Sequence, residues 1–523
     1  MPSQYKKHWL IVITITLILA FSFQGSRGLW EPDEGRYVRC AYEMVQSGDW
    51  LTPRLNGIPH FTKPPLTYWL IATGLSVFGL NEWGARFFHA LAFILIACMA
   101  GYLASRIWDS RTGLLSALVY ATMVFPYIAA NIATTDMLLV CFETAAMLSF
   151  WMCAAKQQNT ALWGTLMGLF SGLAFLTKGP PGLLPLLAGG AYLLLSLRGR
   201  RLSYPVLVPG AFVFAVTALP WFALVTQKHS GLFLYFIGDE LIGRIFTGEH
   251  GRNSGPFGAL KIYPASLLFG ALPWSCFWSI WGWKNRSVIA TRSWWKQLRQ
   301  RDNALFIAVW FLLPLFFLTV ASSRLPMYVL PLFVPLALAT SRSLLQQYSG
   351  QAASLFLLRG KPVVYVLLLV CILIGSRAVA AYQTPKRDSR SLWLQLRTAI
   401  HEYAKEAPYE LATIGLNYDG LTFYSRRAID RVQVREEHTQ AFIKKKKLEQ
   451  KCGEMLKSDV LQVFLVSRSD VKRVAPVFEK MGFQYSIEKG PFDYALFFCQ
   501  NPASSKSMTT KTAKHNNGSA PVN

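Results

Sequence analysis

Charged residues are scarce in this sequence, and their scarcity excludes most soluble folds. Asp, Glu, Lys and Arg make up only 15% of the 523 residues, whereas soluble domains usually contain roughly 25%. Hydrophobic residues account for 52%, which excludes a long disordered chain because disorder requires low hydrophobicity. The 8 cysteines are too few for a small fold held together by disulfides. The class that remains is a polytopic membrane protein.

The sequence also lacks the motifs of nucleotide and metal chemistry. It contains no Walker loop, no G-x-G-x-x-G loop, no zinc-ligand spacing and no G-x-S-x-G elbow. Asp239, Glu249 and His250 are the side chains that most suggest a metal, but their spacing fits no strong ligand pattern. We therefore expect neither a cofactor nor a metal.

The net charge of +25 suggests nucleic acid at first sight, but the position of the basic residues argues against it. Before residue 380 most of them lie in short loops between apolar runs, where the positive-inside rule places them in membrane proteins. The remainder suit anionic lipid headgroups or phosphorylated substrates. The expected partners therefore include membrane lipids and exclude nucleic acid.

Apolar runs that are long enough to cross a bilayer recur through the first three quarters of the chain. They predict about eleven transmembrane helices, at 9–23, 86–105, 112–129, 134–153, 160–177, 181–197, 204–226, 258–282, 303–321, 326–341 and 362–382. With the N-terminus inside, the basic loops fall on one side, which identifies the cytoplasm. The first outer loop, residues 24–85, and everything after residue 383 then lie outside. A cleaved signal peptide is the alternative for the first run, but the motif and the spans that follow favour an uncleaved helix.

The chain changes character after residue 382, where the predicted transmembrane domain (1–382) ends. Apolar runs shorten to strand length at 411–416, 460–466 and 494–498, and amphipathic helical stretches occur near 437–452 and 469–481. This alternation predicts a small α/β domain over 383–500, outside the membrane. The composition of 501–523 predicts a disordered tail. Cys452 and Cys499 share the α/β domain, and whether they pair is left open.

The first outer loop contains the strongest local signal. Pro32 suits the first position of a helix, and the acidic residues that follow it suit the positive helix end. Apolar residues then recur on one face until Gly48, which predicts an amphipathic helix at the membrane–water interface. A second such helix is predicted to begin after the two prolines at 64–65 and to end at Phe78.

Two charged side chains of this loop suggest chemistry. A carboxylate such as Asp33 can act as a base or orient a nucleophile, and an ammonium group such as Lys63 can hold a phosphate leaving group. Helices on the membrane surface would bring both to the mouth of the bundle. The alternative is structural: Asp33 then only places charge at a helix N-terminus, and Lys63 only snorkels.

The loop resembles that of a known family. Its stretches WEPDEGRY and MVQSGDWLTPRLNGIPHFTKPPLTYW are similar to the first periplasmic loop of bacterial aminoarabinose lipid A transferases and of protein O-mannosyltransferase-like enzymes. These are GT-C membrane glycosyltransferases. The resemblance covers the layout of the whole chain. It implies a polytopic α-helical fold with interfacial helices, an outer catalytic loop, a C-terminal soluble domain and a polyprenyl-phosphate sugar as donor.

The resemblance also assigns roles to residues of the loop. It implies that Asp33 is the catalytic aspartate, that Arg36 belongs to the same catalytic group, and that Lys63 binds the donor phosphate. Thr62 departs from the family pattern, because lipid A transferases have Glu before this lysine. The difference leaves the choice of donor, and any metal beside the phosphate, open.

Further residues at the outer ends of predicted spans match the family pattern. The resemblance implies that Asp136 positions the acceptor or the loop, and that Lys178, in an L-T-K-G run, contacts a phosphate or the acceptor. Arg244, Arg324 and Tyr328 would bind the donor phosphate; the last two lie in RLPMYVLP, which is similar to the family's K-L-P-x-Y-x-L-P. The structural alternatives are a helix cap or an ion pair with a loop arginine for Asp136, snorkelling for Lys178 and an interfacial anchor for Arg324 and Tyr328.

The function expected from these residues is an inverting glycosyl transfer at the outer side of the bacterial inner membrane. The leading reaction moves 4-amino-4-deoxy-L-arabinose, or a related sugar, from undecaprenyl phosphate to lipid A or another envelope glycolipid. An enzyme that attaches mannose or a similar sugar to exported protein is one alternative. A flippase or transporter of lipid-linked sugars is the alternative of another class. A transporter should place its polar residues near the bilayer midplane, whereas here they gather near one boundary.

Overall fold

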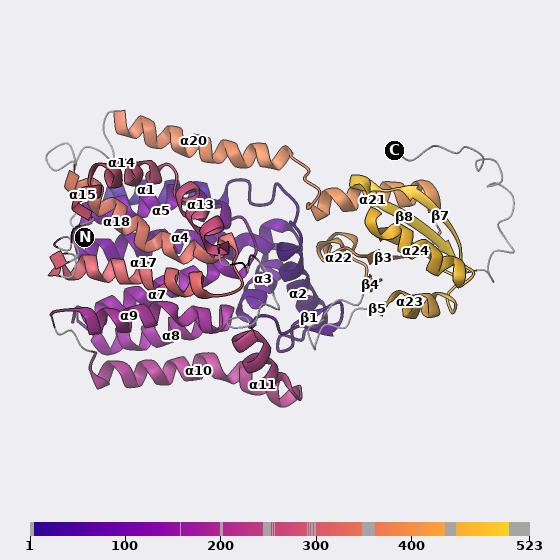
Figure 1. Ribbon diagram of the computed structural model, residues 1–523, viewed down its shortest axis with the longest axis horizontal. Coiled ribbons are helices and arrows are strands. Elements are labelled where there is room, and N and C mark those ends of the chain that lie inside the picture. The colour runs from indigo at the N-terminus through magenta and orange to yellow at the C-terminus, as the bar shows by residue number, and fades with distance from the viewer. Residues whose placement is uncertain are drawn as a thin grey trace. The chain divides into compact units, whose positions relative to one another are not determined.

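The computed structural model describes residues 5–156, 158–198, 202–243, 253, 255, 257–289, 291, 293, 296–297, 300–347, 361–405, 407–434 and 446–501. The chain forms two compact units (Figure 1). The helical unit consists of Met1–Arg27, Met44–Pro53 and Phe61–Gln383, and the sheet unit of Gly28–Glu43, Arg54–His60 and Thr384–Asn523. Two pieces of the first outer loop thus belong to the same unit as the C-terminal domain.

Seven helices of the helical unit, counted over the described residues, are long and apolar enough to cross a membrane. They are α4 (Glu82–Ile107), α7 (Thr135–Ala154), α8 (Thr160–Lys178), α10 (Tyr204–Lys228), α17 (Asp302–Val320), η5 with α18 (Pro326–Gln347) and most of α20 (Lys361–Tyr382). The first predicted span forms the shorter α1 (Lys6–Phe21). The polytopic helical class is confirmed, and the number of about eleven spans stays a prediction.

Two predicted spans are interrupted in the structure. The interrupted runs form α5 (Ser110–Thr122) with α6 (Val124–Ala129), and α13 (Gly258–Gly270) with α14 (Trp274–Lys284). Two others begin with a 3₁₀ segment and continue directly as an α-helix: η2 (Pro180–Leu183) with α9 (Leu184–Leu195), and η5 (Pro326–Leu332) with α18 (Phe333–Gln347). The prediction of continuous helices over 112–129 and 258–282 is wrong for a common reason. A proline lies at or just after each interruption, and proline has no N–H with which to continue a helix. Three further short helices of this unit are α11 (Leu232–Tyr235), η3 (Phe236–Gly243) and α15 (Arg286–Ile289).

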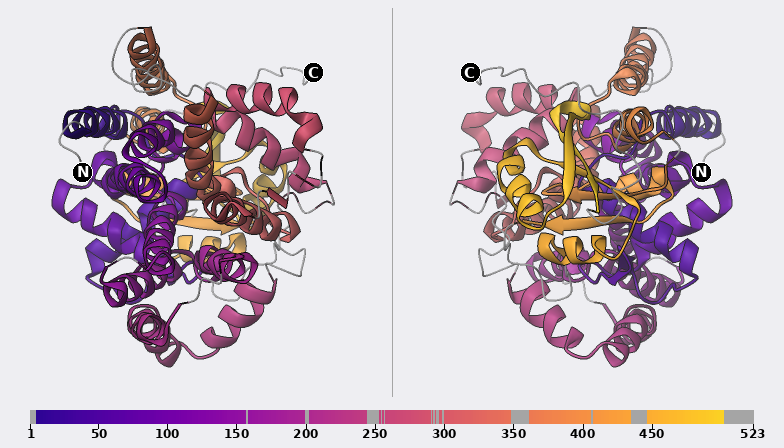
Figure 2. Two further views of the ribbon diagram at one scale, coloured as in Figure 1. Left: turned by 90° about the vertical axis from the view of Figure 1, so that its left-hand side faces the viewer. Right: turned by 90° about the vertical axis from the view of Figure 1, so that its right-hand side faces the viewer.

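Helix α7 is almost entirely buried and packs against α4, α8, α9 and η5. Glycine permits the close packing of α8 against α10. A Cβ on Gly168 would overlap the backbone of Gly210, so the absence of side chains lets the two backbones touch, as small residues do in membrane helices. The left view of Figure 2 looks along several of these helices and shows that they run side by side.

Two buried arginines fix the start of the first outer loop. Arg377 of α20 donates to the carbonyl oxygen of Ser22 (3.0 Å), directly after the end of α1. Arg86 of α4, which is fully buried, donates to the carbonyl oxygens of Gln24 (2.8 Å) and Arg27 (3.0 Å). Carbonyl groups at and beyond a helix C-terminus lack helical partners and attract cations. The chain therefore leaves α1 along a defined path.

The sheet unit contains a six-stranded sheet in the order β5-β4-β3-β6-β8-β7. Its strands are β3 (Tyr409–Ile414), β4 (Ile429–Gln433), β5 (Lys446–Lys447), β6 (Leu461–Val466), β7 (Gln484–Lys489) and β8 (Ala495–Gln500). Strands β5, β4, β3 and β6 pair in parallel, whereas β8 runs antiparallel to β6 and β7. A separate hairpin joins β1 (Arg54–Leu55) to β2 (Ile58–Pro59).

Helices cover both faces of the six-stranded sheet, which the right view of Figure 2 shows in orange and yellow. Helices α21 (Ser389–Ala404) and α22 (Gly420–Ser425) pack on one face, where Leu396 joins Val463 in an apolar core. Helices α23 (Leu448–Met455) and α24 (Arg468–Lys480) pack on the other, where the rings of Phe478 and Phe464 lie 5.1 Å apart. This arrangement confirms the predicted α/β domain.

Several details of that domain differ from prediction. The three predicted strands form β3, β6 and β8, but β4 and β7 were not predicted. The predicted helix 437–452 is wrong at 446–447, which form β5, and the helix begins only at Leu448; residues 437–445 lie outside the described residues. Cys452 and Cys499 are both buried in the same apolar core as free thiols.

Candidate active site

Helix α2 (Asp33–Ser47) presents Asp33 at its first position, one residue later than the predicted start at Pro32. Glu34 Oε2 accepts the amide of Trp30 (2.9 Å) just before the helix, so the acidic residues satisfy and charge the positive helix end. Gly48, with φ of +69°, follows the last residue of the helix. The predicted amphipathic helix is therefore confirmed, and its first turn carries the predicted catalytic aspartate.

Asp33 forms an ion pair with Arg36 within this first turn. Arg36 Nη2 lies 2.6 Å from Asp33 Oδ1. The side chain of Asp33 is 42% exposed and that of Arg36 26% exposed, so the carboxylate stays accessible while the guanidinium limits its orientation. The structure thus brings these two predicted site residues together.

The loop segment that carries Lys63 is held on both sides. On one side, Phe61 is buried, and its ring centroid lies 5.0 Å from that of His229, just beyond α10. On the other side, α3 (Leu66–Phe78) begins directly after the two prolines, as predicted. Lys63 itself is half-buried, and its Nζ donates to the carbonyl oxygen of Thr62 (2.5 Å). Because the backbone is held on both sides of Lys63, the position from which its side chain extends is fixed.

Asp136, Lys178 and Tyr328 come together where α7 begins and α8 ends; we name this group the Lys178 cluster. Lys178 Nζ lies 2.5 Å from Asp136 Oδ1 and 4.4 Å from the centroid of the Tyr328 ring. The side chains of the ion pair are each only 11% exposed. An enclosed ammonium group above an aromatic ring gains cation–π attraction. The partner of Asp136 is therefore Lys178, and not a loop arginine.

Arg324 is buried, and backbone carbonyl groups hold its guanidinium. Nη1 donates to the carbonyl oxygens of Asn253 (3.0 Å) and Gly255 (2.9 Å), and Nη2 donates to that of Thr319 (3.0 Å). A guanidinium has five N–H donors, and Nε has no hydrogen-bond partner among the residues that the structure describes. Arg324 is thus fixed in place with donor capacity left.

Tyr263 of α13 is a member of this neighbourhood that the sequence did not reveal. It is buried, and its hydroxyl interacts electrostatically with Arg324, Tyr328 and Lys178. Three of the predicted site residues therefore lie near this phenol, whose hydroxyl donates to the carbonyl oxygen of Leu318 (3.3 Å). The signal that could have found Tyr263 is weak, because a lone tyrosine in an apolar run usually only packs.

The remaining predictions have different outcomes. Arg244, Glu249 and His250 lie outside the described residues. Within the part of the chain that is described, no three His, Cys, Asp or Glu side chains are grouped so that they could hold a metal ion. Asp33 and Arg36 belong to the sheet unit, whereas Lys63, the Lys178 cluster and Arg324 belong to the helical unit.

The comparisons with known proteins agree with the loop motif. The family model of dolichyl-phosphate-mannose-protein mannosyltransferases matches residues 7–236. The undecaprenyl phosphate-α-4-amino-4-deoxy-L-arabinose arabinosyl transferase of Pseudomonas paraeruginosa is 34% identical over 391 residues, which are 74% of this chain. The enzyme of the same name from Pseudomonas aeruginosa is 33% identical over 392 residues. The chain spans 65% of the length of each of these relatives.

The fold is shared over a longer range. The crystal structure of ArnT from Cupriavidus metallidurans bound to undecaprenyl phosphate has a TM-score of 0.72 and 21% sequence identity, and the match covers 94% of this chain and 98% of that one. The chain therefore has the fold of that crystal structure. The crystal structure of an oligosaccharyltransferase from Archaeoglobus fulgidus is less similar in fold, with a TM-score of 0.53 and 13% identity over 93% of this chain.

Removing one partner of the Asp136–Lys178 pair is expected to destabilise the protein. A charge that remains enclosed after its partner is removed costs about 3–5 kcal/mol, so Asp136→Ala should lower the midpoint of thermal unfolding in detergent. The double variant Asp136→Ala/Lys178→Met removes both charges and should recover most of the loss. An Asp136→Ala variant that unfolds at the wild-type temperature would show that the pair contributes no stability.

Proposed function

We propose that the chain transfers 4-amino-4-deoxy-L-arabinose from undecaprenyl phosphate to lipid A. The similarity to arabinosyl transferases carries this proposal, because 74% of the chain takes part at 34% identity. We place the reaction at the bacterial inner membrane, with the first outer loop and the α/β domain in the periplasm. That side has no nucleotides, which fits a sequence that lacks a nucleotide-binding loop.

The donor phosphate is proposed to bind to Lys63, Arg244, Arg324 and Tyr328. Negative charge builds on this phosphate as the bond between C1 of the sugar and the phosphate oxygen breaks. Cations that are already in place stabilise this transition state more than the ground state. The carbonyl groups that hold Arg324 support such preorganisation, because they fix the guanidinium before any donor binds.

Asp33 is proposed to act on the acceptor. An oxygen of lipid A forms the new bond to C1, and undecaprenyl phosphate leaves with the electron pair of the old bond, so that C1 is inverted in one displacement. If the acceptor is an ionised phosphate, no proton is removed, and Asp33 positions it or stabilises positive charge at C1. If the acceptor is a hydroxyl, Asp33 takes its proton. The ion pair with Arg36 (2.6 Å) directs the carboxylate in either case.

Lys178 is proposed to contact the phosphate of the donor or of the acceptor, and Asp136 to position it. The 2.5 Å ion pair holds the ammonium group over Tyr328, which supports a shared role for the Lys178 cluster. No cofactor or metal enters the proposal. The sugar arrives activated by its phosphate, and cationic side chains supply the charge that stabilises the leaving group.

A protein acceptor is the second candidate. The family model that matches residues 7–236 is named for dolichyl-phosphate-mannose-protein mannosyltransferases, and the name gives a protein as the acceptor. The chemistry at the donor phosphate would be the same, because both kinds of donor carry their sugar on a lipid phosphate. The two candidates therefore differ in the acceptor and in the sugar.

The direct test incubates the purified full-length protein in detergent with radiolabelled undecaprenyl-phosphate aminoarabinose and, in parallel, with radiolabelled undecaprenyl-phosphate mannose. Lipid A and an unstructured Ser/Thr-rich peptide are offered in separate reactions. We expect label in lipid A and none in the peptide. Label in the peptide alone would favour the protein acceptor. No transfer to either, together with movement of labelled lipid across vesicle membranes, would favour a transporter and contradict the proposal.

A further inference from the structure

Hydrogen bonds within the sheet unit hold the residues that precede α2. Residues 28–31, which we name the lead-in segment, run antiparallel beside residues 387–389 of the C-terminal domain. The amide of Ser389 donates to the carbonyl oxygen of Leu29, and the amide of Glu31 donates to that of Arg387, both at 2.9 Å. The backbone of the first outer loop is therefore paired with the backbone of the C-terminal domain.

Side chains of the C-terminal domain strengthen this pairing. Asp388 Oδ2 accepts the amide of Gly28 (2.9 Å), and the Tyr424 hydroxyl accepts the amide of Leu29 (2.9 Å). A Cβ on Gly28 would overlap the Asp388 carboxylate, so the fit requires glycine at this position. Buried amides need acceptors, and here the C-terminal domain supplies them.

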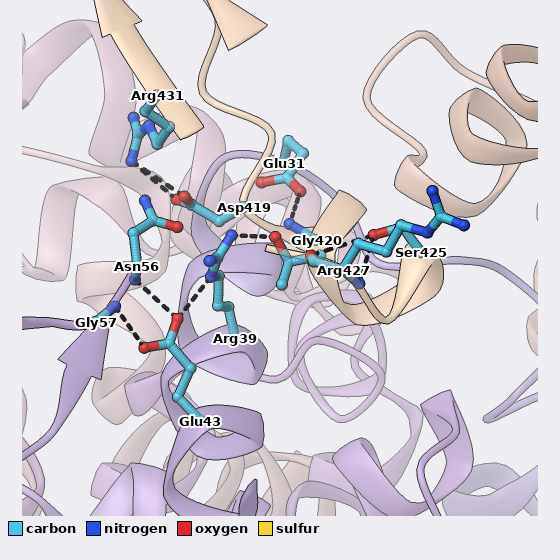
Figure 3. A network of polar contacts seen from close by, with 11 residues as sticks. Glu31, Arg39, Glu43, Asn56, Gly57, Asp419, Gly420, Ser425, Arg427 and Arg431 are labelled. Carbon is cyan, nitrogen blue, oxygen red and sulfur yellow. Dashed lines mark hydrogen bonds and ion pairs between the residues drawn. The ribbon is translucent and has the colours of Figure 1, made fainter. Parts of the chain in front are cut away.

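The carboxyl group of Glu31 joins the lead-in segment to two helices of the C-terminal domain. Its Oε1 accepts hydrogen bonds from Ser389 Oγ (2.5 Å) and from the amide of Gly420 (2.6 Å); Figure 3 shows the bond to Gly420. Ser389 and Gly420 are the first residues of α21 and α22, so one oxygen joins two helix N-termini, where acceptors are favoured. A Cβ on Gly35, in the first turn of α2, would overlap the same carboxyl group. Glu31 thus contacts both α2 and the C-terminal domain.

A second set of contacts holds α2 further along the helix (Figure 3). Arg39 is buried and donates to Thr422 Oγ1 of α22 and to Glu43 Oε1 (2.7 Å). Glu43 in turn accepts the amides of Asn56 (2.8 Å) and Gly57 (2.9 Å) in the β1–β2 hairpin. Helix α2 is therefore held at two places, at Glu31 and at Arg39 with Glu43. Of these two places, only Glu31 is next to Asp33 along the chain.

We propose that Glu31 is a positioning residue through which the C-terminal domain fixes the direction of the Asp33 carboxylate. Only Pro32 separates the two residues, and the fixed φ of proline makes this link stiff. A displacement of the Glu31 side chain therefore passes to the first turn of α2. The role of Asp33 rests on the proposed function, whereas the hydrogen bonds that hold the lead-in segment do not. The C-terminal domain thus has a part in the reaction of the first outer loop, from which it is distant in the sequence.

The test compares full-length variants in detergent by hydrogen–deuterium exchange and by transfer kinetics. In Glu31→Ala, exchange over residues 28–36 should become faster by about tenfold, and kcat should fall about 10- to 100-fold because misplaced groups lose rate steeply. The donor KM should stay unchanged. Glu31→Gln keeps the acceptor oxygen and should retain wild-type exchange and kcat. Wild-type exchange and kcat in Glu31→Ala would overturn the proposal.

Two further variants separate this result from a general loss of stability. Gly420→Ala keeps Glu31 but places a Cβ 2.7 Å from its Oε1, so it should reproduce the effects of Glu31→Ala. Asp459→Ala changes an exposed side chain in the same domain and should leave both readouts unchanged. Failure of the proposed function would look different: the wild type would transfer no sugar to any acceptor, while exchange would still show whether Glu31 holds α2.

A pH dependence of stability follows from the enclosure of Glu31. Burial and the nearby Asp419 raise the pKa of Glu31 well above its usual value. The hydrogen bonds from Ser389 and Gly420 and the charge of Arg431 lower this pKa, but their effect is smaller. The Tyr418 hydroxyl also interacts electrostatically with Glu31. A raised pKa means that the folded state binds the proton more tightly than the unfolded state. The contribution of Glu31 to stability is then present at low pH and is lost as the pH rises through the raised pKa.

The neutral variant Glu31→Gln should therefore become more stable relative to wild type as the pH rises above the usual pKa of a glutamic acid. The measurement is the difference in thermal unfolding midpoint between the two proteins at each pH. A difference that stays constant as the pH rises would contradict a raised pKa for the enclosed Glu31 carboxyl group. Asp459→Ala, which alters an exposed group, provides the control for changes that affect the whole domain.

Discussion

Replacing Asp33 with asparagine is expected to lower kcat for sugar transfer by about 10²–10⁴-fold, the range that a positioned acid or base contributes. Asparagine keeps the size of the side chain and can still accept a hydrogen bond from Arg36. It loses the negative charge that would take a proton from the acceptor, orient it or stabilise positive charge at C1. The measurement is the rate at which purified protein moves labelled sugar from undecaprenyl phosphate to lipid A.

The matched control for this variant is Asp459→Asn, because Asp459 is exposed on the α/β domain. It should transfer sugar at the wild-type rate. Thermal unfolding of both variants checks that neither change acts through stability. A folded Asp33→Asn protein with wild-type kcat would show that the loop carboxylate does not take part in the reaction, and the assignment of α2 as the catalytic helix would be wrong.

Replacing Lys63 with methionine is expected to lower kcat/KM by about 10²–10³-fold, which corresponds to about 2.7–4 kcal/mol of lost transition-state stabilisation by analogy with oxyanion donors. Methionine keeps much of the aliphatic length, so the neighbouring anchor at Phe61 should be undisturbed. The loss follows because the ammonium group would no longer meet the charge that builds on the leaving phosphate. Steady-state transfer kinetics with varied donor measure the effect.

Two companion variants sharpen the result for Lys63. Lys63→Arg keeps the positive charge with a different geometry and should recover part of the rate. Lys457→Met removes an exposed lysine of the α/β domain and should have no effect. If Lys63→Met transferred sugar with the wild-type kcat/KM, the donor phosphate would have to bind elsewhere.

The sequence predicts some elements well because local signals mark their ends. Helices α2 and α3 begin at or next to prolines, and α2 ends before a glycine with positive φ, as those residue types favour. The interrupted spans were not predicted, because hydropathy records the preference of side chains for lipid and not the continuity of backbone hydrogen bonds. Strand β7 was missed because it is an edge strand whose side chains are mostly exposed, so the hydrophobic pattern is weak.

The candidate site shows the same division between local and distant information. The residue types of the Lys178 cluster follow from motifs, but the pairing of Asp136 with Lys178 depends on how α7 and α8 pack, and no local pattern encodes that. Glu31 lies inside the motif that carries the resemblance to the family, yet its partners Ser389 and Gly420 are 358 and 389 residues away in the chain. Contacts of this range become visible only in the folded structure.

Mass spectrometry of lipid A tests the central claim most directly. Lipid A would be extracted from cells that contain this protein and from otherwise identical cells in which it is deleted or carries Asp33→Asn. We expect a species heavier by one aminopentose in cells with the wild-type protein, and its loss in both other strains. Identical lipid A spectra in all three strains, with the donor lipid present, would contradict the claim that this chain transfers aminoarabinose to lipid A.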